Sequence, residues 1–287
     1  MEYHAITRGN CWGAIVGEGP VRLEAGDIVV FPHGDAHVIS SAPGMRASAD
    51  VAIYAEKVDQ LPFTMNFNAM EGHEGTAGDE QYETALVCGF LGCDIRPFNP
   101  LIATLPRLLH LRRTESQDWI LHFIRQAVAE SKGKRPGGEA MLERMSEMMF
   151  VDAVRRYVDK LPENSRGWLA GLRDRYVGRA LGLMHDAPAG EWTVDELGRR
   201  VGLSRSALHE RFVEMIGQPP MQYLASWRMQ VASALLCNTN ATVASVALEV
   251  GYDSEAAFTR AFKRLVGKPP AAWRRQKTER LHAVPVR

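Results

Sequence analysis

The stretch "TVDELGRRVGLSRSALHERFVEMIGQPP" (193–220) occurs again, with changes, as "TVASVALEVGYDSEAAFTRAFKRLVGKPP" (242–270). The two copies match at an offset of 49 residues, and one extra residue in the second turn then shifts the offset to 50. The matched pairs include Thr193/Thr242, Val201/Val250, Gly202/Gly251, Ser204/Ser254, Phe212/Phe262 and Gly217/Gly267. A repeat of this length indicates one supersecondary unit that is used twice.

Each copy has the pattern of a helix-turn-helix. A short helix begins after a threonine cap and ends at Gly202 or Gly251, which can adopt a positive φ. The second helix follows a serine cap, Ser204 or Ser254. Its expected buried face comprises Leu208 and Phe212 in the first copy and Phe258 and Phe262 in the second. The second helix of such a unit is the one that enters the major groove of DNA.

The outward positions around the start of each second helix are the predicted DNA contacts. They are Arg205, Ser206, His209 and Glu210 in the first copy, and Ser254, Glu255, Ala256, Thr259, Arg260 and Lys263 in the second. Between the copies, "MQYLASWRMQVASALL" (221–236) predicts a single helix that spaces the units for two successive groove segments. A helical hairpin repeat can also be a packing device only. Matching caps in both copies and the basic tail "AAWRRQKTER" (271–280) favour DNA binding.

Charge is distributed unevenly along the chain. The whole sequence carries 34 Lys and Arg against 34 Asp and Glu, but Glu191–Arg287 carries 14 against 9. A basic C-terminal segment on an acidic body is consistent with one end that meets a polyanion. By itself this imbalance is weak evidence, because it also arises without a function.

The segments "LSRSALHERF", "WRMQVASALL" and "VASVALEVGYDSEAAFTRAFKRLVGKPPAAWRR" closely resemble the DNA-binding domain of the AraC/XylS family of bacterial transcription regulators. The resemblance covers roughly residues 170–275. It implies a seven-helix domain in which both helix-turn-helix units contact adjacent major grooves. The base-facing positions that it implies are Ser206, His209 and Glu210 in the first unit, and Ala256 and Arg260 in the second.

The chemistry of these side chains differs. Arginine is the commonest base reader, so Arg260 is the first choice for a bidentate contact with guanine. Glu210 could accept a hydrogen bond from a cytosine amine or orient Arg205. Ala256 offers only apolar contact, for instance with a thymine methyl group.

Residues 1 to about 90 are predicted to be rich in strands, as in "VRLEAGDIVVFP" (21–32) and "ASADVAIYA" (47–55). The pattern G-x5-P-x-G-x2-H of the cupin barrel falls on Gly26, Pro32, Gly34 and His37, with Ser41 in place of the usual Asn. This half resembles the cupin-type sensor of a subgroup of the AraC/XylS family. Compared with that subgroup the chain begins late, which indicates a trimmed barrel or a start codon assigned too far downstream.

From about Asn99 the apolar period becomes helical, in "PLIATLPRLLHL" (100–111), in 116–131 and 138–161, and in one further helix over 165–188. The expected fold is α+β. It comprises a cupin-like β-barrel over 1–98, a helical linker or dimerisation region over 99–165, and an all-α AraC-type DNA-binding domain over 166–287. The helix-turn-helix units are placed at about 193–216 and 242–266.

A metal-dependent cupin enzyme with an accessory helical domain is the alternative interpretation. Such enzymes need an H-x-H first motif, which is absent here. We therefore expect no catalytic residues, no cofactor and no metal. His4 and His37 are the weak candidates for metal ligands, with His33 near them in the sequence, but surface or core histidines are the more common explanation.

The four cysteines are too few and scattered for a disulfide framework. Cys11 and Cys88 lie where oxidant-responsive members of the cupin subgroup carry cysteines, and Cys93 could act as their partner. A redox switch needs an accessible thiolate and a resolving thiol. A small-molecule ligand in the barrel is the main competing signal, and buried cysteines without reactivity are common. Cys237 is expected in a core.

The expected partners are double-stranded promoter DNA, RNA polymerase and a small-molecule effector. A homodimer is an open alternative, because the Met-rich segment "AMLERMSEMMFVDAV" (140–154) could pair two protomers or pack within one. The sequence shows no signal peptide and no apolar run of about 18 residues, so we expect a cytoplasmic protein without a membrane partner. Activation is the commoner mode in the family that the chain resembles.

Overall fold

The computed structural model describes residues 1–45, 84–92, 97–113, 118–133 and 135–275. They form two compact units, each described here by itself. The first comprises Met1–Cys93 and Leu105–Lys160, and the second comprises Asp94–Thr104 and Leu161–Arg287. The strand expected over 47–55 lies outside the described residues. The three-part division expected from the sequence stays a prediction.

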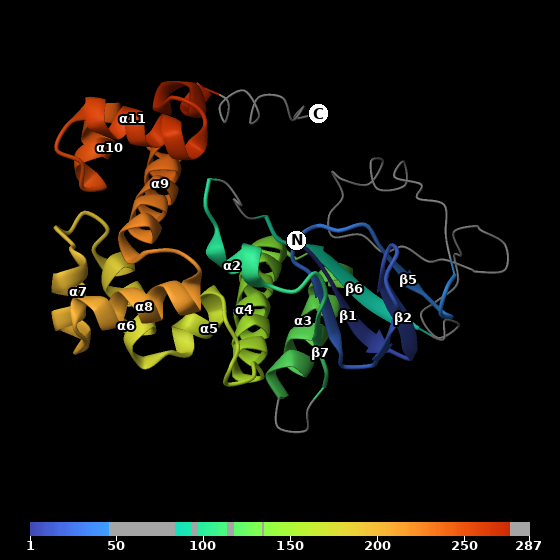
Figure 1. Cartoon of the computed structure of the whole chain (residues 1–287). Helices are drawn as coiled ribbons and strands as arrows, with labels where there is room; N and C mark the ends of the chain where they lie inside the picture. The colour runs from blue at the N-terminus through green and yellow to red at the C-terminus, as the bar shows by residue number, and fades with distance from the viewer. Residues whose placement is uncertain (46–83, 93–96, 114–117, 134, 276–287) are drawn as a thin grey trace. The chain divides into compact units, whose positions relative to one another are not determined.

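The first unit contains two antiparallel sheets (Figure 1). Their strands are β1 (Glu2–Arg8), β2 (Asn10–Ile15), β3 (Val21–Glu24), β4 (Ile28–Phe31), β5 (His37–Ser40), β6 (Ala85–Phe90) and β7 (Leu109–Leu111). One sheet has the order β6-β1-β4-β7 and the other the order β3-β2-β5. In the described part of the chain the strands form two open sheets and not a closed barrel.

Strand β4 is buried on both faces, which explains its uninterrupted apolar sequence. Val29 and Phe31 pack between the two sheets, whereas Ile28 and Val30 face a second core. Helices α3 (Asp118–Gly133) and α4 (Gly138–Asp159) contribute to that second core. The sheet is therefore enclosed between a second sheet and a helical layer.

The Met-rich helix α4 divides its methionines between two environments. Met149 is buried in the core and Met145 packs against it, but Met141 and Met148 are exposed. Packing within one protomer thus explains Met145 and Met149 of this helix, but it does not explain the exposed Met141 and Met148.

The prediction of a helix over 100–111 is wrong for its second half. Helix α2 (Pro100–Thr104) ends early, and Leu109–Leu111 forms β7, which pairs with β4. Pro106 explains the interruption, because proline disfavours a helical conformation in the residue before it and lacks a backbone N–H.

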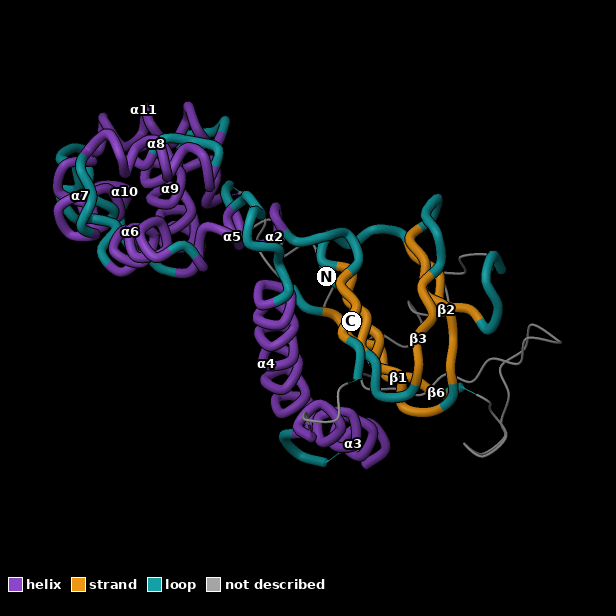
Figure 2. Tube along the Cα trace, turned by 60° about the horizontal axis from the view of Figure 1, so that its bottom comes forward, coloured by secondary structure: helices purple, strands orange, loops and turns teal. Residues whose placement is uncertain are grey.

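The second unit is helical (Figure 2). Its helices are α2, α5 (Trp168–Arg173), α6 (Arg175–Asp186), α7 (Val194–Val201), α8 (Arg205–Ile216), α9 (Pro220–Asn238), α10 (Val243–Glu249) and α11 (Glu255–Val266). The single helix expected over 165–188 is in fact two, α5 and α6. The break is at Asp174, whose ψ of 127° leaves the helical region and whose side chain caps α6. None of the described helices is both long and apolar enough to cross a membrane.

Two hydrophobic cores stabilise the second unit, and α9 belongs to both. Tyr223 and Leu224 join the core formed with α6, α7 and α8. Met229, Ala232 and Leu236 join the core formed with α10 and α11. The single spacer helix predicted between the copies is confirmed, and its two ends each anchor one helix-turn-helix.

Candidate DNA-binding interface

The first helix-turn-helix has the predicted caps. The Thr193 hydroxyl accepts a hydrogen bond from the Glu196 N–H at 3.1 Å, and the Ser204 hydroxyl accepts one from the Ala207 N–H at 3.2 Å. Gly202, which ends α7, has a φ of 86°. Each hydroxyl satisfies a backbone donor that the first helical turn leaves free.

The second unit repeats this chemistry. The Thr242 hydroxyl accepts from the Ser245 N–H at 3.1 Å, and the Ser254 hydroxyl accepts from the Ala257 N–H at 3.2 Å. Helix α10 ends just before Gly251, which has a φ of 80°. The repeat seen in the sequence is therefore a repeat of local structure.

The turn of each unit is tightly packed around a small residue. A Cβ atom on Gly198 of α7 would lie 2.7 Å from the Leu203 carbonyl oxygen, so a larger residue would push the turn outward. In the second copy, a Cβ atom on Gly251 would lie 2.8 Å from Cα of Ala189. Neither position therefore has room for a side chain without a shift of the neighbouring backbone.

Most of the predicted contact residues are accessible. Helices α8 and α11 each bury one face, with Leu208 and Phe212 or Phe258 and Phe262 inside. The exposed candidates are Arg205, Ser206, Glu210, Ser254, Glu255, Ala256, Arg260 and Lys263. His209 and Thr259 are half-buried, and the Nδ1 atom of His209 is buried with no hydrogen-bond partner among the described residues.

Arg205 has a partner that the sequence interpretation did not name. Its guanidinium donates to the Asp195 carboxylate of α7 at 3.1 Å, and both side chains are more than half exposed. The sequence offers Glu210 as a residue that could orient Arg205, but in the structure the carboxylate that pairs with Arg205 is that of Asp195.

Arg228 of α9 is a residue that the sequence analysis missed. Its guanidinium donates to three backbone carbonyls: Pro188 at 2.7 Å, Gly190 at 2.9 Å and Gly251 at 3.1 Å. The first two lie in the segment before α7 and the third lies in the turn of the second unit. Arg228 thus links the two helix-turn-helix units through the helix between them. The sequence contained one indication of this role, since Arg228 stands among the mostly apolar residues of 221–236.

A second missed contact connects α8 to α6. Arg211 donates three hydrogen bonds to the Asp174 carboxylate, from Nε at 3.0 and 2.9 Å and from Nη2 at 2.5 Å, and its guanidinium lies 5.5 Å from the centre of the Tyr176 ring. Burial alone would raise the pKa of Asp174, but hydrogen bonds from Arg211 and from the Val177 and Tyr176 N–H groups hold that pKa below its ordinary value.

Two of the cysteines expected to sense oxidants, Cys11 and Cys88, have thiol pKa values raised above the ordinary value. Cys11 is buried, and burial followed by the charge of Asp27 raises its pKa to about 11. Desolvation and then the Glu2 carboxylate raise the pKa of Cys88. Because Cys88 is an exposed residue, its desolvation is incomplete, and the repulsion by Glu2 is the firmer cause. Cys93 lies outside the described residues. Cys237 of α9 is half-buried.

Two capped, exposed helices held by one spacer define a DNA-binding protein of the double helix-turn-helix class. Comparison with known proteins agrees with this class. The family profile described as "Cupin" matches residues 1–159, and that described as "Helix-turn-helix domain" matches residues 197–276.

Relatives match along almost the whole chain. A protein described as a putative AraC-like transcription regulator of Streptomyces lividans is 31% identical over 97% of this chain and 88% of its own length. The HTH-type transcriptional regulator AlkR of Acinetobacter baylyi is 26% identical over 88% of this chain and 80% of its own length. The chain belongs to the AraC family of DNA-binding transcription regulators that carry an N-terminal cupin domain.

A solved structure is also similar. It is that of the DNA-binding domain of AdpA, a global transcriptional factor, in complex with a target DNA. The sequence identity is 27% and the TM-score is 0.37, and the similarity covers 38% of this chain and 98% of that one.

Proposed function

We propose that the exposed faces of α8 and α11 read two successive major-groove segments on one side of promoter DNA. The observation that carries this proposal is the repeated geometry: two identically capped helices, each with a buried aromatic face and an exposed polar face, joined by α9. A major groove of about 12 Å admits one such helix. Two of them on one spacer can follow the groove along the duplex.

The roles of individual residues follow from their chemistry. Arg260 is exposed and can donate two hydrogen bonds to guanine. Lys263 lies three residues further along α11, is also exposed and suits a contact with a phosphate. Ala256 contributes apolar contact. In the first unit, Ser206, His209 and Glu210 offer weaker or less common base contacts. The second unit is therefore the stronger reader of sequence.

Arg205 is proposed to exchange partners on binding. In the free protein it pairs with Asp195, and a phosphate or a base can replace that exposed carboxylate at small cost. Ser254 and Glu255 lie at the start of α11, and Thr259 lies further along the helix. We assign them to the margin of the same interface.

The cupin half receives the signal that regulates DNA binding. We propose that the chain activates transcription together with RNA polymerase, acts in the cytoplasm where promoter DNA lies, and performs no catalysis. The exposed Met141 and Met148 of α4 are the proposed contact in a homodimer. Sedimentation of the wild-type chain and of a Met148→Glu variant would test that contact.

A small-molecule signal is favoured over an oxidant. Thiolates react with oxidants and thiols do so poorly; Cys11 is buried, and the pKa values of both Cys11 and Cys88 are raised, which disfavours the thiolate. A Cys88→Ser variant should retain its response to the natural signal in a promoter reporter assay. Loss of the response in that variant would restore the oxidant hypothesis.

The experiment that tests the proposal is selection of duplexes from a random library with the purified full chain. The selected site should contain two conserved blocks about 10–10.5 base pairs apart, the repeat of the double helix. A single block, or no enrichment, would show that the two helices do not read DNA together.

A further inference from the structure

Three side chains that can bind metals meet in the first unit. Glu2 and His4 are on β1, two residues apart and therefore on the same face of the strand. His37 begins β5 in the other sheet. The two Nε2 atoms of the histidines lie 2.8 Å apart. The Glu2 carboxylate lies 3.8 Å from Nε2 of His4 and 3.7 Å from Nε2 of His37.

The other ring nitrogen of each histidine already has a partner. Nδ1 of His37 lies 2.8 Å from the Asp35 carbonyl oxygen, which can only accept, so this nitrogen carries the proton and the lone pair of Nε2 faces Nε2 of His4. Nδ1 of His4 lies 2.9 Å from Sγ of Cys88. Histidines that bind metals almost always have such an outer partner, which fixes the ring and its tautomer.

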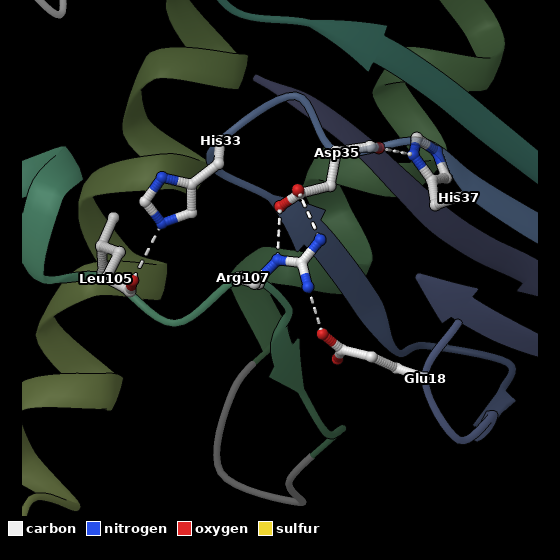
Figure 3. Close-up of polar contacts among 6 residues, drawn as sticks. All are labelled: Glu18, His33, Asp35, His37, Leu105 and Arg107. Carbon is white, nitrogen blue, oxygen red and sulfur yellow. Dashed lines mark hydrogen bonds and ion pairs between the residues drawn. The ribbon is translucent and has the colours of Figure 1, made fainter. Parts of the chain in front are cut away.

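The loop that carries His37 is held rigidly. Figure 3 shows the Arg107 guanidinium against the Asp35 carboxylate, with Nη2 2.7 Å from Oδ1, while the Asp35 carbonyl faces His37. The ring of His37 stacks on Phe31, with centroids 3.8 Å apart and planes at 11°. His33 points away from this group, toward the Leu105 carbonyl at 3.0 Å.

The two histidines lie inside the unit, and Glu2 lies at its edge. Only 5% of His4 is exposed. The site is open on one side, because a quarter of the Glu2 side chain is exposed (26%) whereas those of His4 and His37 are 6% and 10% exposed.

A pair of neutral histidines that share a hydrogen bond would also place the two Nε2 atoms 2.8 Å apart. A histidine pair alone does not account for the Glu2 carboxylate, which places Oε1 3.8 Å from Nε2 of His4 and Oε2 3.7 Å from Nε2 of His37. Ligand atoms around a tetrahedral zinc ion lie roughly 3.3 Å apart, given bond lengths of about 2.0–2.1 Å. The three separations here bracket that value, so small side-chain shifts would bring all three to one ion.

We propose that Glu2, His4 and His37 form a binding site for a divalent transition metal of the zinc type, with at least one coordination position left open. Two imidazoles and one carboxylate select such ions over Mg²⁺ and Ca²⁺, which prefer all-oxygen sites. Three protein ligands are typical of sites where the metal also holds water or a small ligand. The sequence predicted no metal because the H-x-H motif is absent, and it offered His4 and His37 only as weak candidates.

A metal ion at this site would give the cupin half a ligand of its own, separate from DNA binding. Either the metal itself or a small molecule bound at its open position is the signal. Metal binding is measured without DNA, so failure of this proposal leaves the DNA-binding account intact. Failure of DNA binding likewise leaves the metal site testable.

The test uses the full chain, stripped of metal with a chelator and titrated with Co²⁺. We expect one equivalent to bind, with visible d–d absorption and displacement by Zn²⁺. No strong sulfur-to-cobalt charge-transfer band should appear, because Cys88 faces Nδ1 of His4 and not the site. Absence of a visible cobalt spectrum, or its persistence without change in every ligand variant, would overturn the proposal.

The variants are Glu2→Gln, His4→Ala and His37→Ala, each expected to weaken Co²⁺ binding at least tenfold. His33→Ala is the matched control from the same loop and should bind as the wild type does. Because His4 is buried and its loss could unfold the sheet, Glu2→Gln is the deciding variant: it keeps the size of the side chain and removes its charge. Wild-type affinity in Glu2→Gln, or equal loss in His33→Ala, would contradict the assignment.

Discussion

At the scale of single residues, the two cationic side chains Arg260 and Lys263 of α11 are expected to contact different parts of the DNA. Arg260 and Lys263 are both exposed on the same helix, but only the planar guanidinium matches the two acceptors of guanine in the major groove. The sequence repeat was sufficient to place both residues on the outward face. It could not show that Asp195 holds Arg205, because that pairing depends on how α7 and α8 cross.

Arg260→Ala should weaken binding to the selected duplex by about 1–3 kcal/mol and relax the preference at one base pair. Lys263→Ala should weaken binding to all duplexes alike and reduce the slope of log K against log salt by about 1. Fluorescence anisotropy at several salt concentrations measures both effects. If Arg260→Ala left the base preference unchanged, α11 would not be a reading helix in the orientation proposed.

Two glycines at corresponding positions of the repeat differ in what surrounds them. Gly202 and Gly251 both have positive φ, at 86° and 80°. No atom lies within 4 Å of a Cβ added at Gly202, whereas one at Gly251 would meet the backbone of Ala189 at 2.8 Å and the Arg228 guanidinium at 2.9 Å.

Gly202→Ala should therefore lower the free energy of unfolding by roughly 1–2 kcal/mol, the cost of a left-handed conformation for a residue with a Cβ atom. Gly251→Ala should lower it further, because the same strain is joined by a steric clash. Urea unfolding followed by circular dichroism provides the comparison. Equal losses for the two variants would mean that the turn of the second unit adapts freely.

At the scale of secondary-structure elements, the positions at which helices begin and end determine how the helix-turn-helix units are built. The sequence predicted α3, α4, α7, α8 and α9 from apolar periodicity and caps. It failed where one residue interrupts a helical pattern, at Pro106 and at Asp174. The apolar period continues through Asp174, so only the three-dimensional contacts of its carboxylate reveal why the helix breaks there.

Asp174 should make the stability of the second unit depend on pH. Its pKa in the folded state lies below the ordinary 3.8. The contribution to stability is therefore complete above pH 3.8 and is lost as the pH falls through the lowered folded-state pKa. Arg211 is half exposed, with 48% of its side chain accessible, so solvent screening limits the effect to roughly 1 kcal/mol.

Asp174→Asn is the matched variant, because the amide oxygen can still cap α6 but carries no charge. Its unfolding midpoint in urea should be lower than that of the wild type at pH 6, and the difference should shrink as the pH falls toward 2.5. A difference that stays constant over this range would contradict the assignment of the effect to the ionised carboxylate and its pair with Arg211.

Arg228 is the joint between the two helix-turn-helix units. Its three hydrogen bonds to carbonyls are half-buried, and their loss leaves those carbonyls without this donor. Arg228→Ala should lower the free energy of unfolding by roughly 2–4 kcal/mol. Arg228→Lys should recover little of the loss, because an ammonium group cannot span the same three acceptors. Arg179→Ala, at an exposed position of α6, is the control and should leave stability nearly unchanged.

At the scale of the whole molecule, the chain combines an N-terminal cupin domain with a C-terminal DNA-binding domain. The signature Gly26, Pro32, Gly34 and His37 was sufficient to predict the cupin half, and the repeat was sufficient to predict the DNA-binding half. The sequence offered His4 and His37 as weak metal candidates, but it did not predict that Glu2 joins them. Sequence spacing does not show which strands of two sheets lie opposite one another; in the structure β1 and β5 belong to different sheets, and Nε2 of His4 lies 2.8 Å from Nε2 of His37.

The central claim is that both reading helices engage one face of the duplex at the same time. The direct measurement is the affinity of the full chain for its selected duplex and for the same duplex with about five base pairs, half a helical turn, inserted between the two blocks. We predict that the insertion weakens binding at least roughly tenfold, toward the non-specific level. Equal affinity for the two duplexes would contradict the account, because it would mean that one unit binds alone.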